Sequence, residues 1–221
     1  MSDRRASPTA PAPTSLPVLR SPLTTIHANF GAEVLLEGGA EAVRSYGDPE
    51  RERAAMSESI GLADITVRAK IDIRGDVDRV LASSSIEGLA RMTPDWAMMF
   101  APPGPVNDRV ASMQASAGDS TMVTDATHLY GGFALAGPRL PDALARLTSW
   151  DPSTLDAGAA TGAPIADIRA ILMRREDPMP LMEVWVSMEF LRYAWLSILD
   201  VVDRLGGEPV GWDVLRERGW R

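Results

Sequence analysis

Apolar and polar residues alternate in several short segments of the chain. The clearest segment is 67–74, where Val, Ala and Ile at odd positions alternate with Arg, Lys and Asp at even positions. A period of two is typical of a strand that buries one face and leaves the other in water. Residues 110–124 predict a hairpin that turns at Ala117-Gly118-Asp119. Further strands are predicted at 96–101, 128–136, 168–173 and 182–186.

Helical spacing of apolar residues is strongest after the last of these strands. Ser187 is a suitable N-cap, Glu189 lies in the first turn, and Gly206-Gly207 supplies a stop, so a long helix is predicted between them. Strands and helices follow one another without regular βαβ units, which favours an α+β fold with mixed or antiparallel sheets and packed helices. Shorter helices are predicted at 77–82 and 142–150, and 48–56 predicts a short helix or a loop.

Proline and alanine dominate the first 20 residues. Such a composition cannot bury enough apolar surface to offset the entropy of ordering the chain. Residues 1–20 are therefore expected to be a disordered tail. Residues 21–221 are expected to form one folded unit of two closely packed parts, which suits the length of 221 residues.

Composition and charge exclude several classes of protein. The chain has no cysteine, which excludes disulfides, thiolate nucleophiles and cysteine-based metal sites. Its net charge of −8 lacks the basic footprint of a nucleic-acid-binding protein. No apolar run reaches the roughly 18 residues of a membrane-spanning helix. The N-terminus has no secretory signal pattern, so the cytoplasm is the expected location.

Familiar catalytic and nucleotide-binding motifs are absent from the sequence. There is no glycine-rich phosphate loop, no nucleophile elbow and no zinc-binding histidine pair. His27 and His128 are far apart and are expected to be satisfied structural residues, so no metal site is predicted. Asn107-Asp108-Arg109 follows a Pro-Gly-Pro break, where a loop could aim three polar groups into a cleft. The same three residues also fit a turn at the start of a strand.

Six short motifs occur in an order that resembles one known family. They are 21–23 (SPL), 61–66 (GLADIT), 73–75 (IRG), 104–108 (GPVND), 182–186 (MEVWV) followed by Ala194-Trp195, and 213–219 (DVLRERG). In this order the chain resembles the aminomethyltransferase family, which includes the T-protein of the glycine cleavage system and the gamma subunit of heterotetrameric sarcosine oxidase. Because full-length members continue into a C-terminal barrel, the length of this chain is most similar to that of the gamma subunit.

The resemblance implies a site for tetrahydrofolate, whose pterin ring lies in a central hollow in that family. It also implies transfer of a one-carbon unit from a small-molecule amine or methylated substrate. Asn107 and Asp108 match the family's catalytic carboxylate element, and Glu217 matches the glutamate that holds the pterin. The resemblance makes Glu183 a further carboxylate of the site. Arg109 or Arg175 would bind the anionic glutamyl tail of the cofactor.

Three departures from the family pattern leave several interpretations open. Asn107 is an amide where the family has a carboxylate, Glu217 is displaced by a one-residue deletion, and residues 174–181 lack the glycines of the corresponding family element. The first interpretation is an accessory subunit that docks with a larger oxidase-like subunit of an amine-oxidising or demethylating complex. The second is a compact tetrahydrofolate-dependent transferase or demethylase. The third is a family pocket adapted to another small molecule.

Overall fold

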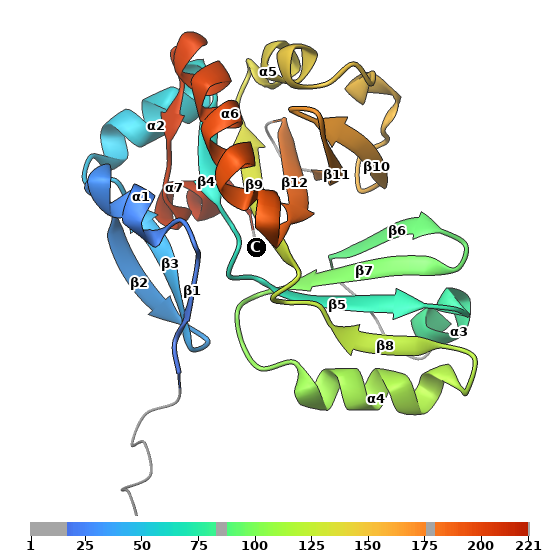
Figure 1. Cartoon of the computed structure of the whole chain (residues 1–221). Coiled ribbons are helices and arrows are strands. Elements are labelled where there is room, and N and C mark those ends of the chain that lie inside the picture. Colours follow the sequence, from blue (N-terminus) through green and yellow to red (C-terminus); the bar gives the residue numbers. More distant parts are fainter. Residues whose placement is uncertain (1–16, 83–87, 176–179, 221) are drawn as a thin grey trace, which may run out of the picture.

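The structure is a computed structural model that describes residues 17–82, 88–175 and 180–220. These residues form three sheets, and helices cover the outer faces of the two larger ones (Figure 1). The predicted α+β class, with mixed and antiparallel sheets and packed helices, is confirmed. No C-terminal barrel occurs among the described residues.

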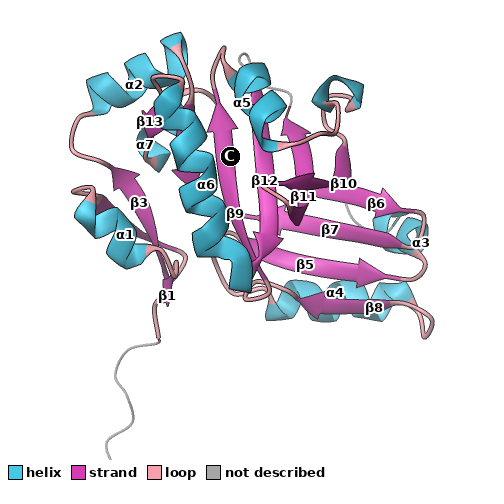
Figure 2. Ribbon diagram, turned by 45° about the horizontal axis from the view of Figure 1, so that its top comes forward, coloured by secondary structure: helices cyan, strands magenta, loops and turns pink. Residues whose placement is uncertain are grey.

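The largest sheet has six strands, with α5 (Leu140–Leu147) and α6 (Leu191–Arg204) packed on one face (Figure 2). Neighbouring strands are antiparallel, except that β13 pairs in parallel with β4. Apolar side chains at even positions of β12 join α5 and α6 in one core, in which Trp195 is completely buried. In order across the sheet, the strands are β10 (Ala160–Ile165), β11 (Ile168–Arg175), β12 (Leu181–Ser187), β9 (Tyr130–Ala136), β4 (Gly61–Asp64) and β13 (Glu208–Pro209).

The second sheet has four antiparallel strands, and its two faces enter different cores. Helices α3 (Val77–Ala82) and α4 (Asn107–Ala117) share a core with its outer face. The inner face meets the six-stranded sheet, where Phe100 stacks on Trp185 with ring centroids 4.2 Å apart. Across the sheet, the strands are β6 (Leu89–Thr93), β7 (Trp96–Ala101), β5 (Ala69–Arg74) and β8 (Met122–Asp125).

The third sheet has three short strands near the N-terminal part of the described chain. Strand β1 (Leu19–Arg20) pairs in parallel with β3 (Ala40–Ser45), and β2 (Glu33–Glu37) pairs with β3 in antiparallel fashion. Its neighbours in the chain and in space include α1 (Thr24–Asn29), α2 (Pro49–Glu58) and α7 (Trp212–Glu217) (Figure 1). Strand β1 belongs to the segment expected to be a tail, so regular structure begins before residue 21. Residues 1–16 of that tail lie outside the described part of the chain.

The strand predicted at 67–74 is confirmed as β5, but its charged face is not in water throughout. Ala69, Ile71 and Ile73 face α3 and α4 as the alternation predicts. Arg68 and Lys70, however, are only 2% and 0% exposed. The six-stranded sheet covers this part of the inner face, so the expectation of a half-buried strand is wrong at these two positions.

The hairpin predicted at 110–124 is wrong, because residues 107–117 form α4 and only 122–125 form a strand. Val110, Met113 and Ala117 repeat at helical spacing and pack toward the core of the four-stranded sheet. Gly118, with φ of 81°, follows α4.

The predicted long helix begins later than expected, at Leu191, after the short 3-10 helix η2 (Met188–Phe190), and the Ser187 side chain makes no capping hydrogen bond. The strand predicted at 96–101 and the helix predicted at 77–82 are confirmed with the same bounds, and the other predicted strands and helices are confirmed with shifted ends.

Gly132 of β9 is expected to be essential for packing against Trp185. A Cβ atom added at Gly132 would lie 2.3 Å from Trp185 Cε3, so the ring must move. We expect Gly132→Ala to lower the free energy of unfolding by about 1–3 kcal/mol, as overpacking does. Gly162→Ala in β10 is the matched control, because its nearest neighbour lies 4.0 Å away. Urea unfolding followed by tryptophan fluorescence measures both, and equal stability of the two variants would contradict the prediction.

Candidate functional site

A carboxylate lies between the two larger sheets with no exposure to solvent. Glu183 is in the middle of β12, and its side chain points away from α5 and α6, as does that of Trp185. Three donors share its Oε1: Arg68 Nη1 at 3.0 Å, Arg175 Nε at 2.9 Å and Trp220 Nε1 at 3.0 Å. Trp185 Nε1 donates to Oε2 at 3.2 Å. We call Glu183 and these four donors the Glu183 cluster.

The donors of the Glu183 cluster come from distant parts of the chain. Arg68 stands just before β5, Arg175 ends β11, and Trp220 follows α7. Burial lowers the pKa of Arg68, although the Glu183 carboxylate opposes this effect. A buried charge is tolerated only when it is paired and hydrogen-bonded. The cluster meets this condition with groups of its own chain.

Lys70 places a buried amine next to Trp185 of the Glu183 cluster. Its Nζ donates to the backbone oxygens of Thr66 at 2.6 Å and Thr127 at 3.0 Å, and lies 5.3 Å from the ring centre of Trp185. Burial lowers the pKa of Lys70 to about 7. Lys70 therefore changes its protonation near neutral pH.

A cavity of about 390 Å³ lies beside the Glu183 cluster. Two arginine–indole contacts line it: Arg68 lies 5.0 Å from the ring centre of Trp220, and Arg216 lies 4.9 Å from that of Trp212. Glu37 holds Arg216 through two hydrogen bonds of 2.7 and 2.8 Å. Glu183 does not line the cavity, although Arg68 and Trp220, both bonded to it, do.

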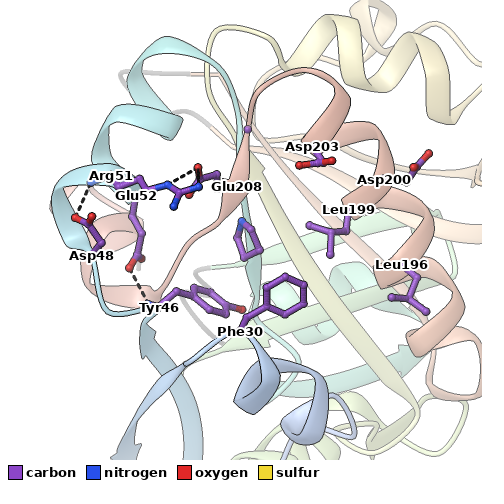
Figure 3. A pocket seen from close by; sticks show the side chains of 12 residues that line it. Phe30, Tyr46, Asp48, Arg51, Glu52, Leu196, Leu199, Asp200, Asp203 and Glu208 are labelled. Atoms are coloured by element: carbon purple, nitrogen blue, oxygen red, sulfur yellow. Dashed lines mark hydrogen bonds and ion pairs between the residues drawn. The ribbon is translucent and has the colours of Figure 1, made fainter.

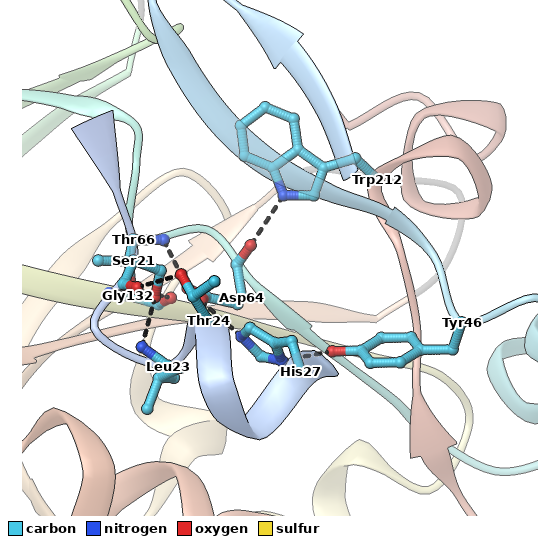
Figure 4. A network of polar contacts seen from close by, with 9 residues as sticks. All are labelled: Ser21, Leu23, Thr24, His27, Tyr46, Asp64, Thr66, Gly132 and Trp212. Carbon is cyan, nitrogen blue, oxygen red and sulfur yellow. Dashed lines mark hydrogen bonds and ion pairs between the residues drawn. The ribbon is translucent and has the colours of Figure 1, made fainter. Parts of the chain in front are cut away.

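A second polar network joins α1 to β4 (Figure 4). Tyr46 Oη lies 2.9 Å from His27 Nδ1, and His27 Nε2 lies 2.8 Å from Asp64 Oδ2. Burial would raise the pKa of Asp64, but hydrogen bonds from His27, Ser21 and Thr66 bring it below its usual value. Burial also raises the pKa of Tyr46 far above its ordinary value, so the phenol stays protonated. The network is therefore satisfied within itself.

Tyr46 also lines a larger cavity of about 540 Å³ between α2, α6 and β13 (Figure 3). Carboxylates are numerous in its wall, but several already have partners. Arg51 Nε donates to Glu208 at 2.6 Å, and Glu52 accepts hydrogen bonds from Ser45 and from two backbone N–H groups. Glu52 is thus a structural acceptor at the edge of this cavity.

The structure brings two of the six predicted site residues together. Glu183 and Arg175 meet in the Glu183 cluster. Glu217 lies on the exposed side of α7, where its carboxylate accepts two hydrogen bonds from Arg53, at 2.6 and 2.9 Å. The remaining three predicted residues, Asn107, Asp108 and Arg109, are exposed in the first turn of α4, which is a helix start rather than the expected loop or strand start.

Sequence reasoning missed Arg68, Lys70 and Trp220 as parts of the central site. For Arg68 and Lys70, the signal was a pair of charged residues in a strand whose other face is apolar. A solvent-exposed strand face has the same pattern. Sequence reasoning also missed the pairing of His27 with Asp64.

Within the described ranges, no group of three or more His, Asp or Glu residues could hold a metal ion. None of the described helices has the length and apolar character needed to cross a bilayer.

No protein-family model and no curated protein matches the sequence. Solved structures do match. The glycine cleavage system aminomethyltransferase T from Bartonella henselae has a TM-score of 0.73 at 18% identity, over 89% of this chain and 60% of that chain. The chain has an aminomethyltransferase-like fold. A chain of the heterotetrameric sarcosine oxidase from Corynebacterium sp. U-96, solved with pyrrole 2-carboxylate, has a TM-score of 0.60 at 15% identity, over 71% of this chain and 91% of that chain.

The aminomethyltransferase-like fold is the one implied by the six ordered motifs. Three of them lie in or beside elements of the six-stranded sheet, α6 and α7: 61–66, 182–186 with Ala194-Trp195, and 213–219. These three motifs lie on the sheet that holds Glu183 and on helices packed against it, and the fold resemblance that the motifs indicate is confirmed.

Loss of the Glu183 charge is expected to be far more costly than loss of the Glu217 charge. Glu183→Gln leaves Arg68 and Arg175 without their buried counter-charge, so we expect the free energy of unfolding to fall by about 3 kcal/mol or more. Glu217→Gln is the matched control, because its pair with Arg53 is exposed and screened by water. Urea unfolding should show no measurable change for this control. Similar losses in both variants would contradict the central role of Glu183.

The lowered pKa of Lys70 predicts that the folded protein becomes more stable as the pH rises above neutral. Its folded pKa of about 7 lies below its ordinary value of 10.5, so the unfolded state binds more protons between these values. The free energy of unfolding should therefore increase from pH 7 to 9, by at most about 1.4 kcal/mol per pH unit. Lys70→Met should remove this contribution, as measured by urea unfolding at several pH values. Equal pH slopes for the two proteins would disprove it.

Proposed function

We propose that this protein is an accessory subunit of an amine-oxidising or demethylating complex linked to tetrahydrofolate one-carbon metabolism. In this role the chain supports a larger oxidase-like subunit and carries out no chemistry of its own. The observation that carries the proposal is the closed state of the Glu183 cluster. Glu183 has no solvent exposure, and three donors of its own chain occupy Oε1.

Tetrahydrofolate does not fit the Glu183 cluster in this closed state. A pterin ring would need a carboxylate that accepts its N–H donors in charge-assisted pairs. The corresponding positions around Glu183 are filled by Arg68, Arg175 and Trp220. No catalytic step through the cofactor is therefore assigned to this chain.

The predicted catalytic residues also support a non-catalytic role. Asn107 and Asp108 are exposed at the start of α4, on the outer helix layer of the four-stranded sheet (Figure 1). Neither has a hydrogen bond with the Glu183 cluster. General acid–base chemistry needs groups within hydrogen-bond reach of one reacting atom. Asn107 and Asp108 have no such arrangement with Glu183 or its four donors.

The surface and the structural likeness support a role in an assembly. Phe190, Tyr193 and Leu196 are exposed at the beginning of α6, and Phe30 is exposed across the larger cavity from Leu196. Exposed apolar groups that gather on one face are typical of protein interfaces. The matched sarcosine oxidase is itself a heterotetramer, and the match spans 91% of one of its chains.

A compact tetrahydrofolate-dependent transferase or demethylase is the second candidate function. The cavity beside the Glu183 cluster favours it, because indoles and guanidinium groups suit a flat aromatic ligand with an anionic tail. In that role Asp108, Glu183 and Glu217 would be the carboxylates of an enzyme for an amine or methylated substrate. Arg109 or Arg175 would bind the anionic glutamyl tail of the cofactor. This role requires the Glu183 cluster to open.

The accessory role predicts a stable complex with a larger subunit. The tagged chain, purified under native conditions from its own cells, should elute at fixed stoichiometry with an oxidase-like polypeptide. The complex should consume oxygen with sarcosine, and a strain lacking this chain should lose that activity. Tyr193→Glu should weaken the complex, whereas Met122→Glu, also at an exposed apolar position but on β8, is the control. A monomer from wild-type cells, with oxidation unaffected by deletion of the chain, would refute the role.

The two candidate functions differ in what the isolated chain binds. Tetrahydrofolate at 100 times its dissociation constant would raise the free energy of unfolding by about 2.7 kcal/mol. The accessory role predicts no shift of the melting temperature with tetrahydrofolate for the isolated chain. A clear shift, together with one-carbon transfer by the monomer, would establish the second candidate instead.

A further inference from the structure

The 540 Å³ cavity between α2, α6 and β13 has an apolar wall that is open to solvent (Figure 3). Phe30, which follows α1, and Leu196, on α6, are 48% and 46% exposed, although both side chains are large and apolar. Tyr46 and Leu199 belong to the same wall. A cavity of this volume has the size of a small-molecule site. It can therefore bury the apolar body of a ligand.

The ring of Tyr46 is held in place before any ligand arrives. Its Oη lies 2.9 Å from His27 Nδ1, and the two rings meet edge-on with centroids 6.0 Å apart. The backbone N–H of Tyr46 donates to Glu52 Oε1 at 2.7 Å. Binding is less costly when the receiving group is already fixed. Aromatic rings such as those of Tyr46 and Phe30 also attract cations to their faces.

Acidic side chains outnumber basic ones around this cavity. Among the described residues that line it, one is basic and five are acidic: Arg51, and Asp48, Glu52, Asp200, Asp203 and Glu208. Arg51 is already paired with Glu208. The acidic residues do not form a metal site, because no group of three or more such ligands within the described ranges could hold a metal ion. The charge of the wall therefore favours an organic cation.

Asp203 stands at an unfavourable position for a carboxylate. It is the penultimate residue of α6, and the C-terminal end of a helix carries partial negative charge that repels an anion. Asp200, almost one turn earlier, accepts hydrogen bonds of 2.9 and 3.1 Å from Arg204. Arg204 attracts the Asp203 charge as well, but no hydrogen bond or ion pair joins the Asp203 side chain to a described residue. A ligand cation beside Asp203 would relieve the repulsion.

We propose that this cavity binds a small organic ammonium ion with a flat apolar body. The body would pack among Phe30, Tyr46 and Leu199, and the ammonium group would lie beside Asp203 at the end of α6. This inference concerns the isolated chain. It is independent of the accessory role and of the Glu183 cluster.

The test compares 2-phenylethylamine with 2-phenylethanol. The two compounds have nearly the same shape, but only the amine is charged near neutral pH. Calorimetric titration of the full chain should show binding of the amine at least about tenfold tighter than binding of the alcohol, because a hydrogen bond to a charged group contributes more than a neutral one.

Replacement of Asp203 separates a binding role from a structural one. Asp203→Asn should weaken binding of the amine to about the level of the alcohol and leave binding of the alcohol unchanged. Its melting temperature should not fall, because the substitution removes a charge that the helix end repels. Asp119→Asn is the matched control, since Asp119 is also exposed but lines none of the cavities described above. This control should bind the amine as the wild-type protein does.

Four results would overturn the proposal. Equal affinity of the wild-type protein for the amine and the alcohol would mean an apolar cavity without selection for charge. Unchanged binding of the amine by Asp203→Asn would place the ammonium group elsewhere. Equal losses in Asp203→Asn and Asp119→Asn would mean attraction by the overall negative charge of the chain. Absence of amine binding to the folded wild-type protein at millimolar concentration would show that the cavity takes no such ligand.

Discussion

A single buried carboxylate connects the three sheets of this protein. Glu183 belongs to the six-stranded sheet, Arg68 leads into the four-stranded sheet, and Trp220 follows the helix that packs beside the three-stranded sheet. Removing charges from water is costly, so such an arrangement adds little net stability compared with apolar packing. The arrangement instead fixes the positions of its members, because Arg68 and Trp220 must both reach Glu183 Oε1. Glu183 therefore contributes to the relative placement of the three sheets, together with the apolar core that they share.

The sequence predicts the individual elements better than their partners. The alternation at 67–74 correctly predicts a strand. It does not show whether the charged face of that strand contacts water or a buried counter-charge. Arg68 is buried because Glu183, 115 positions away in the sequence, lies opposite it. The helix at 107–117 was missed because Gly118 and polar residues around it also suit a hairpin. His27 and Asp64, 37 positions apart, meet only in the folded chain.

The candidate site was predictable only in part, and for a related reason. Resemblance to a family pointed to Glu183 and Arg175, which do meet. It pointed equally to Glu217 and Asn107, which are exposed on separate helices. Fold and site are under different constraints: the fold needs apolar residues at spaced positions, whereas the site needs particular groups at particular distances. A chain can therefore keep the fold at 15–18% identity while a tryptophan fills the space beside a site carboxylate.

Helix α7 connects the two polar networks of the molecule. Trp212, at its start, donates from Nε1 to the Asp64 backbone oxygen at 2.8 Å (Figure 4), and Trp220, beyond its end, donates to Glu183. The ion pairs of α7 with Arg44, Arg53 and Glu37 lie at the surface and restrain it only weakly. Its buried anchors are instead Trp212, Val214 and Leu215. All three precede Gly219, so the buried anchors of α7 are separate from Trp220, which is held by its own hydrogen bond to Glu183. The indoles of Trp212 and Trp220 are in edge contact, with ring centroids 5.1 Å apart. The Glu183 cluster and the backbone of Asp64 are therefore joined in space by the contact between these two indoles.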